Sequence, residues 1–565
     1  MRDVIVIGGG VAGLVAAREC AHIGLSVTVL EATDAVGGAV AHHEVAGLTL
    51  DSGAESFAVR RGSVAQFVAD LGLSDEVVAP NPAGAWLHLP ALGTSGGTRG
   101  GPGGRPGGEL AGGSVSVPLP KAGVLGIPGS PLATDVRRVL GGGGAWRAYL
   151  DRLIPVLKIG REHSLGELVR KRMGRRVLER LVEPVASGVY SASALDLEVD
   201  VVAPGLNGAL TTTGSLSGAV LALRAAAPAG SAVGGLRGGM SRLVDALVAD
   251  LEHFGVEIVT GSRVQGLAAG RSDDEPVWTV TLGEVAPATD GEGPDTSTTD
   301  GPVISSSATD TSATDGPVPS SPVTDGLATD GLATDGLATD GPVASSPATD
   351  SPMLVNSPLE SRFVIVATPG AQALNFLASL GPELAALTEL DWPEPTVVEL
   401  ATFVLDAPAL DVHPRGTGVL VAASTPGVTA KALTHVSAKW AWVAEAAGEG
   451  RHVVRLSYGR DGESSLTDAL DDEEFQALAV QDASLLLGVE LDPSTVVGFA
   501  RTEWRDALSP ATIGARERVH SVRGVVATVP GLELTGAWLA GTGLASVIPD
   551  AVATAGRIRH LALGL

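Results

Sequence analysis

The chain has 565 residues, 44% of them hydrophobic and 3% aromatic, and a formal net charge of −26. This length predicts one large enzyme fold or two to four domains, and the acidic balance argues against nucleic-acid binding, which requires a basic face. The single cysteine cannot form an internal disulfide, and no Cys/His spacing indicates a metal site. A strand begins by residue 3, which leaves no room for a signal peptide, and no apolar run is long enough to span a bilayer. The expected location is the cytoplasm, with contact to a membrane surface left open.

Hydrophobic periodicity along the chain predicts alternating helices and strands. The expected elements are, in order, a strand at 4–7, a helix at 14–22, a strand at 26–30, a mostly helical region at 132–223, a helix at 240–254, a strand at 256–260, strands at 277–282 and 362–367, a β-rich stretch at 397–456 and a final helix at 550–563. This alternation is typical of an α/β (α+β) protein built around a nucleotide-binding domain.

Two stretches have compositions that cannot bury enough apolar surface to fold. Residues 93–116 are rich in glycine, and residues 284–361 repeat short Ala-Thr-Asp-Gly units without any lysine or arginine. We therefore expect both to be disordered, low-complexity inserts. The second lies between the strands expected at 277–282 and 362–367, so we interpret it as an enlarged surface turn, which costs little in loop closure.

The strongest functional signal is the glycine pattern that follows the first strand. Gly8, Gly10 and Gly13 form G-x-G-x-x-G, in which the first glycine permits a tight turn and the second lets the backbone approach a pyrophosphate. Phosphate oxygens would meet the free N–H groups and the positive dipole end of the next helix. Glu31 ends the second strand, where a carboxylate can accept hydrogen bonds from a ribose without a 2′-phosphate. The predicted phosphate-binding residues are Gly8, Gly9, Gly10, Val11, Ala12 and Gly13.

A second pair of glycines follows the acidic residue. Glu31 and Ala32 precede Gly37 and Gly38 in an E-A-x4-G-G pattern. This pattern resembles the large flavin family of monoamine oxidases, phytoene desaturases and porphyrinogen oxidases. In that family the paired glycines let the chain pass close to FAD, so the resemblance favours FAD over NAD as the cofactor.

Later blocks narrow the resemblance. They are residues 51–57, 119–123, 126–128, 164–170, 179–184, 188–190, 236–240, 416–421 and 437–440. Together they resemble the oxygen-dependent protoporphyrinogen and coproporphyrinogen III oxidases of haem biosynthesis, most of all the Gram-positive coproporphyrinogen III oxidases. The blocks at 181–190 and 416–421 are the most discriminating, and the resemblance covers nearly the whole chain outside the two inserts.

The resemblance implies three structural parts, namely a Rossmann-like FAD domain, a β-sheet substrate domain and a helical domain near the membrane surface. The expected ranges are 1–60, 230–283, 362–385 and 520–565 for the FAD domain, 61–92, 205–229 and 386–519 for the substrate domain, and 117–204 for the helical domain.

The resemblance also implies the reaction and further FAD contacts. A porphyrinogen loses six electrons in three steps, each of which passes a hydride to flavin N5, and O2 reoxidises the flavin to give hydrogen peroxide. No catalytic base is predicted, since the cofactor carries the chemistry. Coproporphyrinogen III is the favoured substrate, and protoporphyrinogen IX stays open. The implied additional FAD contacts are Gly53, Ala54, Glu55, Ser56, Val264, Trp504, Ser546, Val547 and Ile548.

The propionates of such a substrate require local positive charge in an acidic protein. We expect them to contact Arg60 and Arg61, which follow the 51–57 block, and Lys121, which lies in a loop after two prolines. Contacts with a membrane surface and with the next enzyme of the haem pathway are further expectations, whereas no nucleic acid is expected.

Two segments depart from the family pattern. We align the family's G-[IV]-G-[IVL]-P-D with residues 545–550, which puts Val547 at a glycine position near the isoalloxazine and Pro549 at the start of the final helix. At 509–515 the family's proline is displaced and its terminal histidine is absent. Two alternatives therefore stay open, a flavin amine oxidase and an FAD-binding scaffold that has lost catalysis. The first is weakened because only three tyrosines are available for an aromatic cage.

Overall fold

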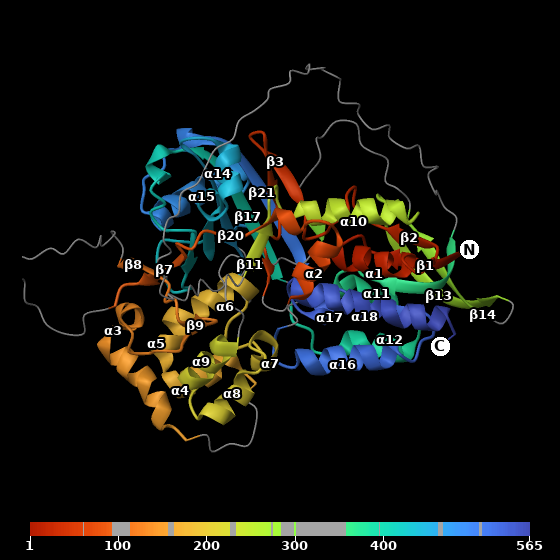
Figure 1. The fold of residues 1–565 in the computed structure, drawn as a ribbon, viewed down its shortest axis with the longest axis horizontal. Helices are drawn as coiled ribbons and strands as arrows, with labels where there is room; N and C mark the ends of the chain where they lie inside the picture. Colours follow the sequence, from red (N-terminus) through yellow and green to blue (C-terminus); the bar gives the residue numbers. More distant parts are fainter. Residues whose placement is uncertain are drawn as a thin grey trace, which may run out of the picture.

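The computed structural model describes residues 1–59, 62–92, 113–155, 163–226, 233–272, 275–283, 299–300, 358–394, 396–460, 467–507 and 511–564. These residues form two large sheets and a layer of helices, which occupy three regions of the molecule (Figure 1). The predicted α/β (α+β) class, with a Rossmann-like part, a sheet part and a helical part, is confirmed.

The first sheet has the N-terminal strand near its centre. Its strands are, in order, β12 (Glu257–Val259), β2 (Val27–Leu30), β1 (Arg2–Ile7), β16 (Leu359–Val366), β14 (Glu275–Leu282) and β13 (Val264–Ser272), with β22 (Leu532–Leu534) also paired to β16. The pairs β12–β2, β2–β1, β1–β16 and β16–β22 are parallel, whereas β16–β14 and β14–β13 are antiparallel. Parallel strands are buried on both faces, which explains the continuous apolar run in β1.

Helices cover both faces of this sheet. Val4 and Val6 of β1 pack against one set of helices, and Ile5 and Ile7 pack against the other. The first set comprises α1 (Val11–Ala21), α10 (Ser241–His253) and α18 (Leu544–Ala562), with α2 (Ser63–Asp70) beside it. The second set comprises α11 (Gly370–Ala378), α12 (Pro382–Ala385), α16 (Ala515–Val526) and α17 (Ala537–Ala540).

The final helix begins earlier than predicted. α18 starts at Leu544 instead of residue 550, so Pro549 lies inside the helix and not at its first position. Proline suits the first turn, and that preference misled the sequence interpretation. The true start is marked by Gly543, which is the N-cap residue at φ +99°.

The second sheet is mainly antiparallel. Its strands are, in order, β15 (Thr299–Asp300), β21 (Val496–Ala507), β17 (Thr396–Asp406), β20 (Arg451–Tyr458), β19 (Ala432–His435), β18 (Gly418–Val421), β7 (Ala85–Pro90) and β8 (Ser114–Pro118). Helix α15 (Asp472–Leu487) packs on one face through Phe475 and Leu486. The other face carries Arg455 and Leu420, which contact the first sheet's loops and the helical layer respectively.

Small elements connect the two sheets. They are the hairpin β3 (His42–Val45) and β4 (Leu48–Asp51), the sheet of β5 (Phe57–Ala58), β11 (Val233–Leu236) and β6 (Val77–Val78), the pair β9 (Gly123–Val124) and β10 (Ile127–Pro128), and the helices α13 (Val436–Lys439) and α14 (Ala441–Ala447).

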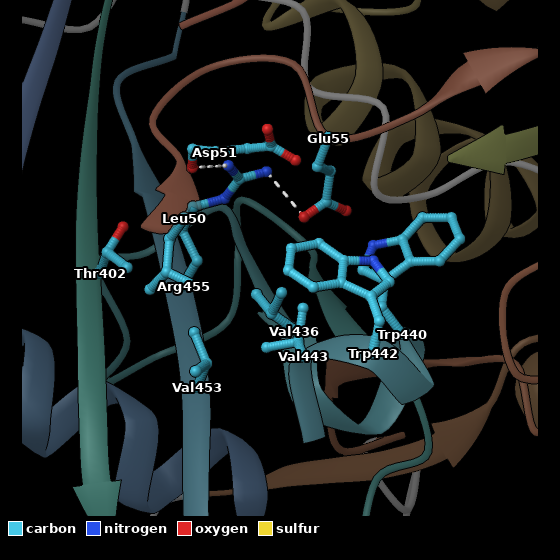
Figure 2. A pocket seen from close by; sticks show the side chains of 10 residues that line it. All are labelled: Leu50, Asp51, Glu55, Thr402, Val436, Trp440, Trp442, Val443, Val453 and Arg455. Atoms are coloured by element: carbon cyan, nitrogen blue, oxygen red, sulfur yellow. Dashed lines mark hydrogen bonds and ion pairs between the residues drawn. The ribbon is translucent and has the colours of Figure 1, made fainter. Parts of the chain in front are cut away.

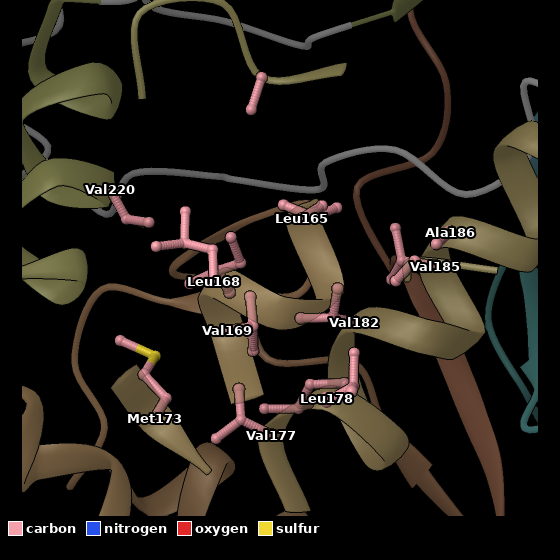
Figure 3. Packing of buried hydrophobic residues seen from close by; sticks show 14 of the residues in the cluster. Leu165, Leu168, Val169, Met173, Val177, Leu178, Val182, Val185, Ala186 and Val220 are labelled. Atoms are coloured by element: carbon pink, nitrogen blue, oxygen red, sulfur yellow. The ribbon is translucent and has the colours of Figure 1, made fainter. Parts of the chain in front are cut away.

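The predicted helical region is confirmed as a layer that packs on the second sheet. It contains α3 (Thr134–Tyr149), α4 (Leu165–Met173), α5 (Arg175–Val177), a π-helical turn at Leu178–Val182, α6 (Glu183–Tyr190), α7 (Val199–Val202), α8 (Leu206–Thr213) and α9 (Leu216–Ala226). Its apolar core is built largely from valine and leucine side chains of α4 to α6 (Figure 3). Leu87, Leu420 and Ala432 of the sheet join the same core, which fixes the layer against β7, β18 and β19.

Most residues of the two predicted inserts, 93–116 and 284–361, lie outside the described residues. Their edges and residues 299–300, which form β15 beside β21, do not, and there the prediction is wrong. Residues 114–116 belong to β8 and residues 359–361 belong to β16, because Val115 pairs with Leu89 and Leu359 pairs with Val280. The strands expected on either side of the second insert are confirmed as β14 and β16.

Candidate FAD site

The turn after β1 has the geometry that its glycines predict. Gly8 has φ +108°, and its N–H donates to the Leu30 carbonyl at 2.8 Å. A Cβ on Gly13 would lie 2.0 Å from the Gly8 carbonyl oxygen, so α1 packs on the turn only because residue 13 has no side chain. A Cβ on Gly10 would meet no protein atom within 4 Å. Gly10 is the N-cap of α1, so this open space lies at a helix N-terminus, where anions bind favourably.

Glu31 lies beside the same turn. One carboxylate oxygen accepts from the Gly9 N–H at 2.7 Å, and the other accepts from the Thr33 N–H at 2.9 Å. The carboxylate is therefore held at the carboxyl end of β2 next to the start of α1. This is the position from which an acidic residue reaches the ribose of a dinucleotide.

The second pair of glycines packs against the first turn. The Gly37 N–H donates to the Gly9 carbonyl at 2.9 Å, and Gly37 forms an isolated parallel bridge with Gly10. Gly37 and Gly38 have φ +117° and +58°, which side chains rarely adopt. A Cβ on Gly38 would lie 3.3 Å from the Gly10 Cα. The structure therefore joins the two glycine motifs through their backbones.

The segment around Gly53 continues from these motifs toward the second sheet. The Ala54 N–H donates to the Ala39 carbonyl at 2.9 Å. A Cβ on Gly53 would lie 2.2 Å from that carbonyl oxygen and 2.9 Å from the Trp504 ring. Trp504 is 1% exposed, and its indole N–H donates to the Ser52 carbonyl at 3.1 Å. Trp504 thereby fixes the segment against β21.

A buried charge cluster of Glu55, Lys439 and Arg455 joins this segment to the second sheet. The Glu55 carboxylate accepts from Lys439 of α13 and pairs with Arg455 of β20 at 2.9 Å. Arg455 also donates to the Gly53 carbonyl at 3.0 Å and to the Asp51 carbonyl at 3.1 Å, and Figure 2 shows it between Asp51 and Glu55. Burial by itself would raise the pKa of Glu55, but the two cations outweigh it and hold that pKa below its usual value.

Asp51 faces a small cavity beside this cluster. The cavity walls are mainly apolar, with Leu50, Val436, Trp440 and Val443 among them (Figure 2). The Asp51 carboxylate accepts from the Met240 N–H at 2.7 Å, next to the first turn of α10. Burial raises the pKa of Asp51 to about 7.

The substitution Asp51→Asn is expected to raise the thermal midpoint relative to the wild-type protein by more at about pH 8 than at about pH 5. Between its usual pKa and about 7, folded Asp51 holds a proton that the unfolded chain releases, so its contribution to stability falls as the pH rises through that window. Asparagine keeps an acceptor for Met240 but does not titrate. Thermal unfolding at both pH values would measure this difference, with the exposed Asp34→Asn as control. An equal effect at both pH values would show that Asp51 does not hold this proton.

The start of α18 supplies a glycine pair that the sequence interpretation missed. Gly541 and Gly543 have φ +100° and +99°, and a Cβ on Gly543 would meet no protein atom within 4 Å. The Ile548 side chain is instead buried in the core that α18 shares with α1, and Val547 is 6% exposed. A glycine–x–glycine–leucine run therefore occurs four residues before the position at which we aligned the family pattern. Starting the alignment from α18's N-cap glycine would have found it.

Pro549 and Asp550 misled that alignment, because both lie within α18. The Asp550 carboxylate accepts from Arg523 and from the Thr535 hydroxyl, the latter at 2.9 Å. Asp550 therefore ties α18 to the neighbouring elements. Ser546, Val547 and Ile548 stay predicted FAD contacts through the first turns of α18.

Two buried donors near the glycine turns have no hydrogen-bond partner in the described part of the chain. They are the Thr368 hydroxyl and the Trp538 indole N–H. Thr368 follows β16 at the carboxyl edge of the sheet, directly after Ala367, whose carbonyl oxygen would lie 2.8 Å from a Cβ on Gly8. Ligands of parallel sheets bind at this edge. Unpartnered donors at this edge indicate a ligand site. Sequence motifs do not identify Thr368 or Trp538, because their place at the edge follows from the order of the strands.

The other predicted contacts are placed as follows. Val264 begins β13 and is 5% exposed, so its side chain belongs to the core. Lys121 lies in the helical layer, where its N–H donates to Asp135 and its carbonyl accepts from Arg224. Arg60 and Arg61 lie outside the described residues. In the 509–515 segment, residues 509 and 510 are also outside, whereas Ala511 packs in the helical core.

The described residues fit a dinucleotide with an adenosine diphosphate half. They combine an open glycine turn, a helix N-terminus, a positioned carboxylate and unpartnered buried donors at one sheet edge. No cluster of His, Cys, Asp or Glu in the described part of the chain could hold a metal ion. No helix in the described ranges is long and apolar enough to cross a bilayer.

This chain is similar in sequence and in fold to known proteins. A family model described as flavin containing amine oxidoreductase matches residues 11–306 and 350–558. The coproporphyrinogen III oxidase of Mycobacterium leprae (strain TN) is 27% identical over 562 residues, covering 98% of this chain and 97% of the relative. That of Bacillus subtilis (strain 168) is 23% identical over 568 residues, covering 98% and 96%.

Solved structures agree on the fold. One assigned as a protoporphyrinogen oxidase, from Exiguobacterium sp. 255-15, has a TM-score of 0.69 and 22% identity, covering 100% of this chain and 99% of that one. Cyclohexylamine oxidase from Brevibacterium oxydans IH-35A has a TM-score of 0.54 and 12% identity, covering 100% and 99%.

Proposed function

Because this chain belongs to the flavin-containing amine oxidoreductase family, we propose that it is an FAD-dependent oxidase that converts coproporphyrinogen III to coproporphyrin III. The observation that carries the substrate is the alignment, from end to end, with relatives named coproporphyrinogen III oxidase. Protoporphyrinogen IX is the second candidate, since a protoporphyrinogen oxidase 2 from Arabidopsis thaliana aligns over 50% of this chain.

In this proposal the N–H groups at the start of α1 bind the FAD diphosphate, and Glu31 binds the adenosine ribose. The predicted contacts at Gly37, Gly38 and the Gly53–Ser56 segment bind FAD along with them, and Gly541 and Gly543 are added to this set. Bound FAD supplies the electron acceptor for each two-electron oxidation, with O2 as the final acceptor and hydrogen peroxide as its product.

The chain's own residues position and shield the reacting centre. Arg455 donates to the Gly53 carbonyl and so keeps this segment against the face of the second sheet opposite α15. The Glu55 carboxylate pairs with both Arg455 and Lys439, so neither cation is buried beside the Gly53 segment without an anion. No described side chain is assigned as a catalytic base.

The positions of two tyrosines argue against the amine oxidase alternative. Tyr458 is 1% exposed and packs against Phe475 on the α15 face of the sheet, away from Arg455. Tyr149 stacks on Trp146 in the helical layer. Neither tyrosine is therefore available for an aromatic cage beside the Gly53 segment.

Turnover by the purified, FAD-loaded protein tests the proposal. Coproporphyrinogen III supplied under air is expected to give porphyrin fluorescence and three equivalents of hydrogen peroxide, about tenfold or more faster than protoporphyrinogen IX does. The reverse preference would assign protoporphyrinogen IX as the substrate. Bound FAD without turnover of either porphyrinogen, or of simple amines, would support the scaffold alternative and contradict the proposal.

A peripheral membrane contact belongs to the same proposal, and the surface of the helical layer supports it. Trp146 is 56% exposed and Leu153 is 75% exposed, while the Arg152 guanidinium covers the Tyr149 ring. Exposed aromatic and apolar side chains beside cations are typical of surfaces that bind anionic lipid. No described surface favours contact with the next haem-pathway enzyme, so that contact stays a prediction.

We expect the protein to sediment with vesicles that contain about 30% anionic phospholipid, and much less with neutral vesicles. The variant Trp146→Ser with Leu153→Ser is expected to stay in the supernatant. Equal sedimentation of the wild-type protein and this variant would contradict membrane contact through this surface. Loss of binding in about 0.5 M salt would identify the electrostatic share of the interaction.

A further inference from the structure

Lys431 is a completely buried lysine at the contact between the second sheet and the helical layer. Its side chain is 0% exposed, and its ammonium donates to the Ser191 hydroxyl at 2.6 Å. Its backbone N–H donates to the Ser457 carbonyl at 2.8 Å, and its carbonyl accepts from the Val421 N–H at 3.0 Å. The residue is thus locked between β18 and β20, with its side chain aimed at the end of α6.

This ammonium has no anion beside it. Among the described residues no Asp or Glu pairs with Lys431, and the charged group that acts on it is another cation, Arg460. Burial and, to a lesser extent, the positive charge of Arg460 together lower the pKa of Lys431 to about 7. Lysines are almost never completely buried without a partner, because removing the charge from water is costly. The site therefore lacks a negative group that would offset this cost.

Two further hydroxyls on the elements that meet here are buried without a hydrogen-bond partner among the described residues, those of Ser187 on α6 and Ser457 on β20. Ser187 lies in the last turn of α6, and its carbonyl accepts from the N–H of Ser191, the residue that caps this helix, at 3.1 Å. Ser457 contacts the Lys431 backbone directly. One ammonium and three hydroxyls are the donor set that a carboxylate binds well.

The backbone around α6 also departs from regular helix geometry. A π-helical turn at Leu178–Val182 comes directly before α6, and Ser191 ends the helix at φ +55°. π-Helical turns and left-handed non-glycine residues are concentrated at functional sites. The deviation at Ser191 occurs at the residue that contacts Lys431.

Lys431 and its neighbouring serines lie close to the Gly53 segment, which we predict to contact the flavin. Arg455, which holds the Gly53 carbonyl, and Ser457 are two residues apart on β20, so their side chains lie on the same face about 7 Å apart. From Arg455 toward the helical layer, the next position on that face is Ser457, beside Lys431. A substrate that touches the flavin at the Gly53 segment would extend toward this cluster.

We propose that Lys431, together with Ser187, Ser191 and Ser457, binds one carboxylate of the substrate. This assignment rests on the proposed function, because it treats the ligand as a porphyrinogen that carries propionates. Lys431 acts as a binding residue for the substrate and takes no part in electron transfer. It supplements the predicted contacts Arg60, Arg61 and Lys121.

The test measures binding of coproporphyrin III, the reaction product, to the FAD-loaded protein by quenching of tryptophan fluorescence. Lys431→Met keeps the length of the side chain and removes its charge. Since hydrogen bonds to charged groups contribute about 1.5–3 kcal/mol, the Kd is expected to rise about tenfold or more. The KM for coproporphyrinogen III should rise similarly, while the bound FAD and kcat stay within about twofold. Lys171→Met, at an exposed lysine of α4, is the matched control and should leave the Kd unchanged.

A purely structural role predicts a different result. If Lys431 only ties α6 to the sheet, Lys431→Met lowers the thermal midpoint and leaves the Kd for coproporphyrin III unchanged. That result would overturn the proposal for Lys431. Turnover by the wild-type protein would still support the proposed function. The variant Ser457→Ala removes one hydroxyl donor with little risk to folding. An unchanged Kd for coproporphyrin III in both variants would overturn the proposal. If the wild-type protein neither binds coproporphyrin III nor oxidises coproporphyrinogen III, the proposed function fails and this assignment fails with it.

Discussion

Gly10→Val is expected to yield a folded protein that no longer retains FAD. Residue 10 has φ −66° and ψ 169°, which any amino acid adopts, and a Cβ there meets no protein atom within 4 Å. The valine side chain would therefore occupy the space at the start of α1 that we assign to the diphosphate. Loss of about two hydrogen bonds to an ionised group costs about 3 kcal/mol or more, so the Kd for FAD should rise at least about a hundredfold.

Flavin absorbance of the purified protein and titration of the apoprotein with FAD would measure this loss, with circular dichroism as the check on folding. Gly524→Val is the matched control, because a Cβ on this exposed glycine of α16 also meets no protein atom. Gly13→Val is the contrasting variant. Its side chain would overlap the Gly8 carbonyl, so it should lose the fold of the first sheet as well as FAD. Normal FAD binding by Gly10→Val would contradict the assignment of the diphosphate to α1.

Glu55→Ala is expected to produce a large loss of stability. The substitution leaves Lys439 and Arg455 buried without their shared carboxylate, and breaking a buried ion pair in this way costs about 3–5 kcal/mol. The folded pKa of Glu55 is lowered, so its stabilising contribution is present above the pKa of the unfolded chain and is lost as the pH falls through the folded value. The difference between variant and wild type should therefore be large near pH 7 and shrink below about pH 4.

Chemical denaturation at several pH values would measure this loss. Glu445→Ala is the control, because Glu445 faces Arg237 at 3.9 Å and both side chains are exposed. Such a surface pair contributes about 0–1 kcal/mol. Lys439→Met in the Glu55→Ala background should recover part of the loss, since it removes one of the unpaired cations. Equal destabilisation by Glu55→Ala and Glu445→Ala would show that the cluster does not join the two sheets.

The geometry of the N-terminal glycine turn could be predicted because the contacts involved are local. β1, the turn at Gly8, α1 and the carboxylate of Glu31 lie within one strand–helix–strand unit, where residue spacing sets the geometry. The same reasoning failed at α18. A proline inside a helix and a proline at its first position look alike in a short window, so Pro549 was taken as a boundary when Gly543 is the N-cap.

The insert edges were also misplaced for a physical reason. Residues 114–116 are Ser-Val-Ser and directly follow the glycine-rich stretch, which led us to include them in it, but they pair with β7 through Val115. Strand formation depends on a partner elsewhere in the chain, and composition does not reveal that partner.

By itself the sequence determined the fold class, the glycine turn, its acidic partner and the family resemblance that implied FAD, because each depends on residue types at short spacing. Only the tertiary structure decided which distant residues act together. Glu55 and Lys439 are 384 residues apart, and Lys431 meets Ser191 across 240 residues. Such pairs arise where a sheet, a loop and a helical layer are packed together, and no periodicity in the sequence encodes that packing.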